Sequence, residues 1–279
     1  MHPRRTVTHL LLCATLAIAG CSTSTRSPQN LSQRWIQASY WLLGERHDAP
    51  EHQQLAADTL QTLAQSGRLR ALVLEMAERG RSTEGLPANA QEGMVRAALL
   101  WNEAGWPWAA YSAPIMTAVR AGIPVAGANL SRTQMHDAMK NEAIDATVTG
   151  LTREMHMKNV RDGHCNLLPE AQIGPMARVQ IARDQSMAST LQQFQESAGP
   201  GQVTVLLAGS VHVDNTVGVP MHLPSGSAIS VLMLAGGADV PDRLAPPGYD
   251  AVWPTPPVPD KDYCAGIPMK NKEPIKPPT

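Results

Sequence analysis

Acidic and imidazole side chains follow three of the short apolar runs in this chain of 279 residues. "YWLLGERHD" places Glu45 and His47 after one run, "LVLEM" ends a second run at Glu75, and "VTVLLAGSVHVDN" places His212 after a third. Residues two apart in an extended segment point to the same side, so Glu45 and His47 can face one site. The neighbouring glycines permit tight turns and the close approach of a ligand to the backbone.

Two carboxylates and two imidazoles that converge at one place have three possible roles. Glu45, His47 and His212 could bind a divalent metal through oxygen and nitrogen. Together with Glu75 they could perform acid–base catalysis, in which a glutamate deprotonates water and a histidine protonates a leaving group. They could also form a hydrogen-bonded cluster that only braces the loops. Four such groups at matching strand ends favour a functional site.

The elements that must position these groups are short apolar runs separated by helical patterns. The apolar runs predict strands at 40–43, 71–74, 123–126, 203–208 and 228–234. Continuously apolar strands separated by helices indicate an α/β fold with a mostly parallel sheet covered by helices on both faces. Residues 131–197 contain helical patterns only and predict a helical insertion. Ligands of such sheets bind beyond the carboxyl ends of the strands, where the acids and histidines stand.

The N-terminal residues are typical of an export signal. Arg4 and Arg5 precede a short apolar run that ends in "IAGC", and the run is too short to span a bilayer as a stable helix. This pattern resembles the bacterial lipobox, which implies removal of residues 1–20 and attachment of diacylglycerol to the Cys21 thiol. Ser22 in place of aspartate implies sorting to the outer membrane. A secretory signal with a chance cysteine is the alternative.

The remaining chain divides into three parts by composition. We expect a polar tether over 21–36, an α/β domain over 37–240 and an extended tail over 241–279, which holds 11 of the 23 prolines. Cys165 and Cys264 could pair in an oxidising compartment, although sequence alone does not bring them together. The net charge of −1 gives no reason to expect nucleic acid as a partner.

Seven short motifs follow one another along most of the chain. They are "LLGERHDAPEHQ", "LVLEM", "GWPWAAYSAPI", "IPVAGAN", "GHCNLLPE", "QIARDQSMA" and "LLAGSVHVDNTVGVPMHL". Together they resemble the ChaN-like haem-binding lipoproteins of Gram-negative bacteria, over about residues 41–234. The resemblance implies a haem-binding protein of iron uptake, in which a homodimer can hold two haems face to face. It also implies that a tyrosine holds the iron, with a histidine and a lysine near the propionates.

Three residues are candidates for haem contacts. Tyr111 lies in a matching motif beside three tryptophans, which could pack on a porphyrin or form an aromatic core. His164 could reach the strand-end site from the helical insertion, or be structural. Arg183 could meet a carboxylate of the ligand, or take part in a polar contact between helices. The chain lacks Cys-x-x-Cys-His, so haem would be bound without a covalent link. The other tyrosines that remain open as iron ligands are Tyr40, Tyr249 and Tyr263.

The wider superfamily includes erythromycin esterase-like hydrolases and Tiki-type metal-dependent proteases. Their essential glutamate and histidine patterns fall here on Glu45, His47, Glu75 and His212. We therefore expect a haem-binding lipoprotein of the outer membrane that faces the periplasm. A metal-dependent esterase or peptidase that uses the strand-end residues is the alternative.

Overall fold

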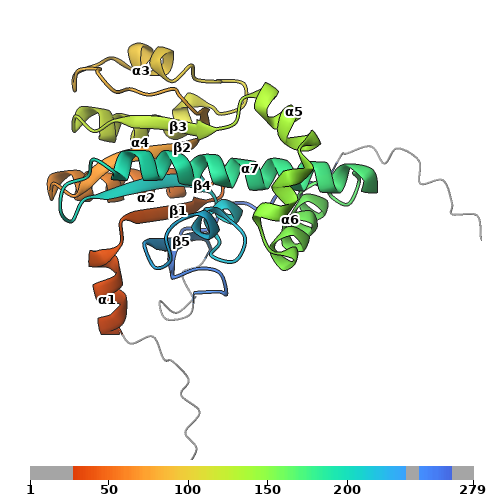
Figure 1. Ribbon diagram of the computed structural model, residues 1–279. Coiled ribbons are helices and arrows are strands. Elements are labelled where there is room, and N and C mark those ends of the chain that lie inside the picture. The colour runs from red at the N-terminus through yellow and green to blue at the C-terminus, as the bar shows by residue number, and fades with distance from the viewer. Residues whose placement is uncertain (1–27, 237–244, 266–279) are drawn as a thin grey trace, which may run out of the picture.

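In the computed structural model, which describes residues 28–236 and 245–265, six strands form one all-parallel sheet in the order β3-β2-β4-β1-β5-β6 (Figure 1). The α/β fold and the parallel sheet expected from the sequence are confirmed. The strands are β1 (Tyr40–Glu45), β2 (Leu69–Glu78), β3 (Val125–Asn129), β4 (Val203–Gly209), β5 (Ala228–Ala235) and β6 (Ala251–Thr255).

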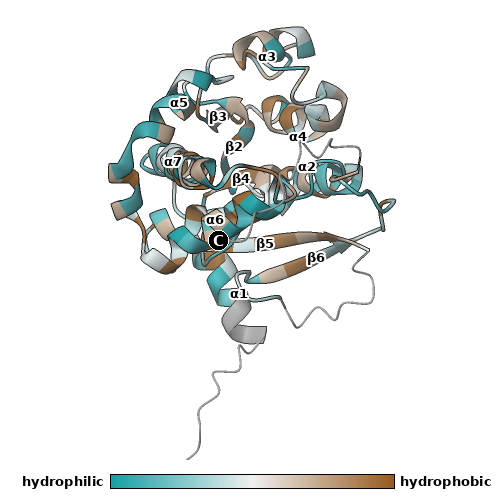
Figure 2. Cartoon of the chain, turned by 90° about the vertical axis from the view of Figure 1, so that its right-hand side faces the viewer, coloured by the Kyte–Doolittle hydropathy of each residue, from teal (hydrophilic) through white to brown (hydrophobic). Residues whose placement is uncertain are grey.

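Helices cover both faces of this sheet, as Figure 2 shows for α7 on one side of β2 and β4 and for α2 and α4 on the other. The α-helices are α1 (Pro28–Gln37), α2 (Pro50–Gln65), α3 (Glu92–Ala98), α4 (Trp108–Arg120), α5 (Arg132–Lys140), α6 (Gly150–Gly163) and α7 (Glu170–Gln195). Residues 28–236 and 245–265 also contain three short 3-10 helices, namely η1 (Glu142–Thr147), η2 (Ser210–Val213) and η3 (Val219–His222).

The two faces of β1 show why its sequence is apolar without interruption. Successive side chains of a strand point to opposite faces. Leu43 therefore packs in the core under α2 and α4, whereas Leu42 packs in the core under α7. Both leucines are 0% exposed, and burial of each contributes roughly 1.5–3 kcal/mol.

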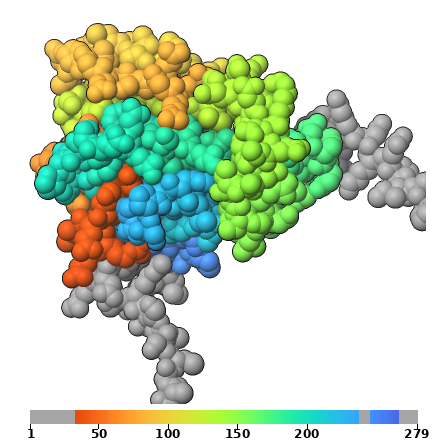
Figure 3. All heavy atoms as spheres, viewed as in Figure 1, coloured from red at the N-terminus to blue at the C-terminus, as the bar shows by residue number. Residues whose placement is uncertain are grey.

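The predicted insertion carries α5, η1, α6 and α7 and contains no strand in the structure, as expected. Its α5–α6 part forms a separate block at one end of the molecule in Figure 3. A disulfide joins Cys165, in the loop between α6 and α7, to Cys264 in the C-terminal segment. The pairing that the sequence left open is therefore present.

Both end segments of the described chain contain regular structure. Residues 251–255, predicted to belong to an extended tail, pair with β5 as the edge strand β6. An edge strand tolerates Pro254 because one side of its ladder needs no N–H donor. At the other end, part of the expected tether is helical. The ring centroid of Trp35 in α1 lies 4.6 Å from that of Trp41 and 5.8 Å from that of Trp253. The proposed lipid attachment site, Cys21, lies outside the described residues.

Candidate functional site

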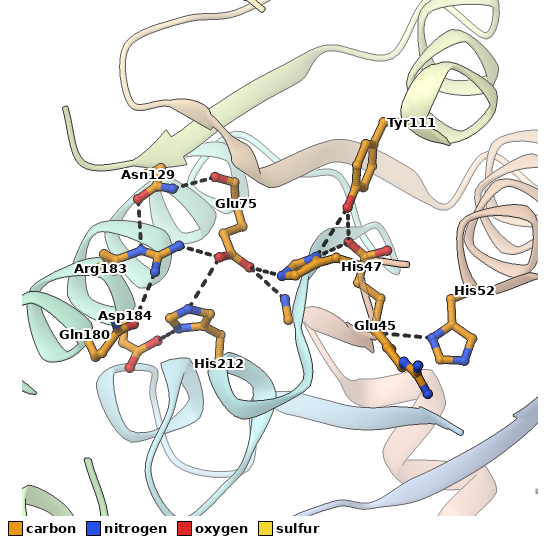
Figure 4. A network of polar contacts seen from close by, with 12 residues as sticks. Glu45, His47, His52, Glu75, Tyr111, Asn129, Gln180, Arg183, Asp184 and His212 are labelled. Carbon is orange, nitrogen blue, oxygen red and sulfur yellow. Dashed lines mark hydrogen bonds and ion pairs between the residues drawn. The ribbon is translucent and has the colours of Figure 1, made fainter. Parts of the chain in front are cut away.

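The carboxyl ends of β2, β4 and β1 lie side by side in the sheet, and the strand-end side chains converge there (Figure 4). Glu45 is the last residue of β1, Glu75 lies near the end of β2, and His212 follows β4 in η2. His47 comes two residues after β1 and lies between the two glutamates. The structure thus brings together the four residues that the sequence singled out, while their roles remain predictions.

Glu45 is a buried carboxylate whose two oxygens are both occupied. It is 1% exposed, and its Oε1 accepts hydrogen bonds from the Tyr111 hydroxyl at 2.9 Å and from His47 Nδ1 at 2.8 Å. Its Oε2 accepts a hydrogen bond from Gln53 Nε2. Gln53 lies in the first turn of α2 and is the last residue of the motif "LLGERHDAPEHQ", but the sequence did not single it out as a site residue. Glu45 therefore holds the His47 ring in one orientation.

Glu75 lies at the centre of the site between one guanidinium and two imidazoles. Its Oε1 binds Arg183 and lies 3.6 Å from His212 Nε2, and its Oε2 lies 3.8 Å from His47 Nε2. The backbone N–H of Gly209 donates to Oε2 at 2.7 Å. Burial raises the pKa of this carboxyl, but the charges of His212, Arg183 and His47 outweigh it and hold the pKa at about 2.

His212 is enclosed between two carboxylates. Its Nδ1 donates to Asp184 Oδ1 at 2.6 Å, and its Nε2 faces Glu75. Burial lowers the pKa of His212, yet Asp184 and Glu75 raise it by more, so the net shift is upward. Asp184 is 1% exposed and lies on α7. The sequence places it next to Arg183 on one helical face, and nothing local connects it with His212.

His47 is the member of the site that solvent reaches, because 39% of its side chain is exposed. Burial lowers its pKa, but the hydrogen bond to Glu45 and the charge of Glu75 raise the pKa overall. Trp106 packs edge-on against its ring at a centroid distance of 4.8 Å. His47 can therefore hold and deliver a proton at Nε2 while Glu45 fixes Nδ1.

The metal site expected at Glu45, His47 and His212 stays a prediction. Among the residues that the structure describes, no group of three or more His, Cys, Asp and Glu side chains could hold a metal ion. The Glu75 carboxylate lies between the two imidazoles, with its oxygens 3.8 Å from His47 Nε2 and 3.6 Å from His212 Nε2.

Tyr111 does not have the accessible position that an iron ligand needs. It is 1% exposed, its hydroxyl donates to Glu45, and burial together with the Glu45 charge raises its pKa far above the usual range. Trp101 and Trp106 pack around its ring at 5.8 and 6.0 Å, so the aromatic segment forms a core. The alternative that the sequence left open for this segment, an aromatic core, describes the structure.

Arg183 is likewise occupied within the protein. Its guanidinium binds Glu75, donates to Asn129 Oδ1 at 3.0 Å and donates to Gln180 Oε1 at 3.2 Å. Its side chain is only 16% exposed. It therefore positions Glu75 and uses three of its five N–H donors within the protein, and its contact with the carboxylate of a ligand stays a prediction.

His164 lies beyond His212, at the end of α6. The two histidines line one cavity of about 200 Å³ between α6, α7 and η2, together with His156 and Asp184. His164 Nδ1 donates to the carbonyl oxygen of Val160 at 2.8 Å. His156 is 1% exposed, and neither of its ring nitrogens has a hydrogen-bond partner. The structure thus brings His164 to the edge of the site, without direct contact with the two glutamates.

Comparison with known proteins gives one family and a small set of solved structures. The family model described as "Haem-binding uptake, Tiki superfamily, ChaN" matches residues 31–223. No curated protein matches the chain. A structure titled as cofacial haem binding to ChaN of Campylobacter jejuni is 19% identical, covers 81% of this chain and 91% of its own, and has a TM-score of 0.61. The type III effector HopBA1 is 16% identical, with coverage of 79% and 88% and a TM-score of 0.48.

Proposed function

Because this chain belongs to the ChaN family of haem-binding uptake proteins in the Tiki superfamily, we propose that it binds haem without a covalent link and serves haem or iron uptake. The family match over residues 31–223 is the observation that carries this proposal. The shared α/β fold of the Campylobacter jejuni protein agrees with it. Since that structure is titled as cofacial haem binding, we extend the proposal to a homodimer that holds two haems face to face.

Titration of the mature protein with hemin tests the proposal. A bound haem gives a Soret band that differs from that of hemin mixed with an inert protein, and the difference saturates at a fixed ratio of haem to protein. Sedimentation of the apo and haem-loaded protein then tests the dimer. Spectra equal to those of hemin with inert protein at every ratio would refute haem binding.

We also propose that the protein is anchored by lipid at Cys21 in the outer membrane and faces the periplasm. The lipobox-like "IAGC" supports the anchor, and the disulfide between Cys165 and Cys264 is of the kind found in oxidising compartments. Within residues 28–236 and 245–265, no helix has the length and apolar character to cross a bilayer. Mass spectrometry of the N-terminal peptide and membrane fractionation of a Cys21→Ser variant test the anchor. Recovery of that variant in the membrane fraction would contradict it.

A second candidate function is acid–base hydrolysis at the strand ends. The observation in its favour is His47, which is exposed to solvent and oriented by a buried carboxylate, as a general acid or base must be. The two glutamates contribute less than the sequence suggests. Glu45 already accepts three hydrogen bonds, and Glu75 with a pKa of about 2 is a weak base.

A screen with ester and peptide substrates tests this second function. Turnover that His47→Ala abolishes and His136→Ala leaves unchanged would support it, because His136 is an exposed residue of α5 that does not belong to the four-residue cluster at the strand ends. If no substrate is turned over, or if His47→Ala retains the turnover, the strand-end residues are not catalytic.

A further inference from the structure

The tyrosines of the described chain are poorly placed to hold iron. Tyr40 and Tyr111 are 5% and 1% exposed. The Tyr249 hydroxyl donates to the Ser210 carbonyl at 3.2 Å, and burial raises its pKa to about 12. Tyr263 is 54% exposed, but its hydroxyl donates to Asp48 at 2.7 Å and accepts from Arg46 Nε at 2.9 Å. Iron binding through any of them would break existing contacts or require access to the core.

Most histidines are also excluded by burial or by their partners. The enclosed ones are His52 at 0%, His156 at 1% and His212 at 8% exposure. The Nε2 atom of His222 is buried. His47 has Nδ1 bound to Glu45 and Nε2 turned towards Glu75.

His164 differs from all of these in its hydrogen bonding. Because a carbonyl oxygen can only accept, the bond to Val160 fixes the ring proton on Nδ1. The neutral ring then carries its lone pair on Nε2, and no described residue binds that atom. A backbone carbonyl that holds one ring nitrogen while the other stays available is the usual arrangement of a histidine that ligates a metal.

The loop that carries His164 is held in an unusual conformation. His164 caps α6, and the next two residues, Cys165 and Asn166, have positive φ angles of 58° and 57°. Consecutive positive φ angles outside glycine are costly and persist where the surrounding structure enforces them, often at functional sites. The disulfide to Cys264 provides such a constraint by tying this loop to the C-terminal segment.

Exposed apolar side chains and an open cavity adjoin the same histidine. Leu167 is 38% exposed, and Val211, which lines the cavity with His164, is 44% exposed. The cavity of about 200 Å³ equals the liquid volume of roughly seven water molecules, which is too small for a porphyrin. A peripheral group can enter it, and it is lined by Asp184 and His156, whose Oδ2 and Nε2 atoms are buried and lie 3.8 Å apart.

We propose that His164 is the residue of this chain that binds the haem iron, through Nε2, with the macrocycle against Leu167 and Val211. The inference rests on the proposed haem binding and goes beyond it, because the family resemblance implies a tyrosine. Two cations, Lys158 and Arg161, lie in the last turns of α6 and could meet the haem carboxylates. Each of them pairs with an exposed acidic group, and such surface pairs are weak and exchange readily.

Hemin titration of matched variants tests the ligand. His164→Asn retains an N–H that can donate to the Val160 carbonyl, but it lacks a nitrogen that binds iron. We expect it to lose the imidazole-type spectrum and to weaken hemin binding by at least the roughly 10–100-fold that loss of a residue supporting a metal ligand costs. His136→Ala, at an exposed histidine of α5, is the control and keeps the wild-type spectrum. Added imidazole should restore the histidine-type spectrum in His164→Gly.

A measurement on the protein without haem provides an independent check. Nitrogen chemical shifts of labelled histidine should identify His164 as the tautomer with its proton on Nδ1. Melting curves establish that each variant folds. If His164→Asn does not fold, imidazole rescue of His164→Gly tests the ligand, and if His164→Gly does not fold, the spectrum of His164→Asn tests it.

The outcomes separate this inference from the proposed function. If wild-type protein binds hemin and His164→Asn binds it with the same affinity and spectrum, the assignment of His164 is wrong while haem binding stands. A spectral change in Tyr263→Phe instead would transfer the role to the exposed tyrosine and overturn the assignment. If wild-type protein does not bind hemin, the proposed function fails and the assignment fails with it.

Discussion

Replacement of His212 by alanine should destabilise the fold much more than it weakens haem binding. The ring lies between two buried carboxylates, with Nδ1 2.6 Å from Asp184 and Nε2 3.6 Å from Glu75. Without it, the buried Asp184 loses the hydrogen bond to its Oδ1, while its Oδ2 has no hydrogen bond and lies 3.8 Å from His156 Nε2. Breaking a buried ion pair in this way costs about 3–5 kcal/mol. For a domain of this size the melting temperature should fall by roughly 6–20 °C.

The unfolding free energy that His212→Ala loses should decrease as the pH rises. The pKa of folded His212 lies above its ordinary value of 6.5, so the charged ring stabilises the fold fully below about pH 6.5. This stabilisation is lost as the pH rises through the folded pKa. The gap in unfolding free energy between wild type and His212→Ala should therefore be widest near pH 6 and narrow towards pH 9. Thermal and urea melts at both values measure it.

Two further variants separate the buried pair from a general loss of packing. His47→Ala removes the other imidazole next to Glu75, but that ring is exposed, and we expect a cost of about 0–1 kcal/mol. The double variant His212→Ala/Asp184→Ala removes both charges. Its loss of unfolding free energy should be smaller than the sum of the losses in the two single variants. A His212→Ala protein that melts within about 2 °C of wild type at pH 6 would refute the reasoning, since about 1 kcal/mol corresponds to 2–4 °C.

Three other changes should have separable effects. Tyr111→Phe removes one of the donors to Glu45 and should cost about 1 kcal/mol in urea melts without any change in the hemin spectrum; a changed spectrum would return Tyr111 to the haem site. Gly44→Ala places a Cβ 2.4 Å from Val213 and should lower the melting temperature clearly, by the roughly 1–3 kcal/mol of an overpacked core; an unchanged melt would mean that η2 moves freely. Cys264→Ser opens a bridge across 99 positions and should cost about 2–4 kcal/mol in non-reducing melts, whereas wild type should show the same loss after reduction.

Local patterns in the sequence were sufficient for the fold class and the place of the site. The strands are apolar without interruption because both of their faces are covered, and this property is visible in runs such as "VTVLLAG". In a parallel sheet the carboxyl ends of all strands lie at one edge, so the sequence placed Glu45, Glu75 and His212 at the same edge. That they are neighbours follows from the strand order, in which β2, β4 and β1 lie side by side, and only the structure gives this order.

Two features of the ends of the fold were decided by tertiary contacts. Proline-rich residues 251–255 form β6 because β5 offers them an unpaired edge, and no periodicity in the sequence marks that strand. The expected tether becomes helical near the domain because Trp35 packs on Trp41 of β1 and on Trp253 of β6.

The partners of the site residues were also decided by the tertiary structure. Asp184 reaches His212 only because α7 packs across the sheet at that height, and the 28 positions that separate them contain no signal of the contact. The sequence left a haem contact and an aromatic core open for Tyr111, and the packing of α4 buries this residue against Glu45. Residue type and spacing fix which groups stand at the end of a strand. Their exposure and protonation depend on the distances to side chains from other elements, and these distances exist only after the helices have packed.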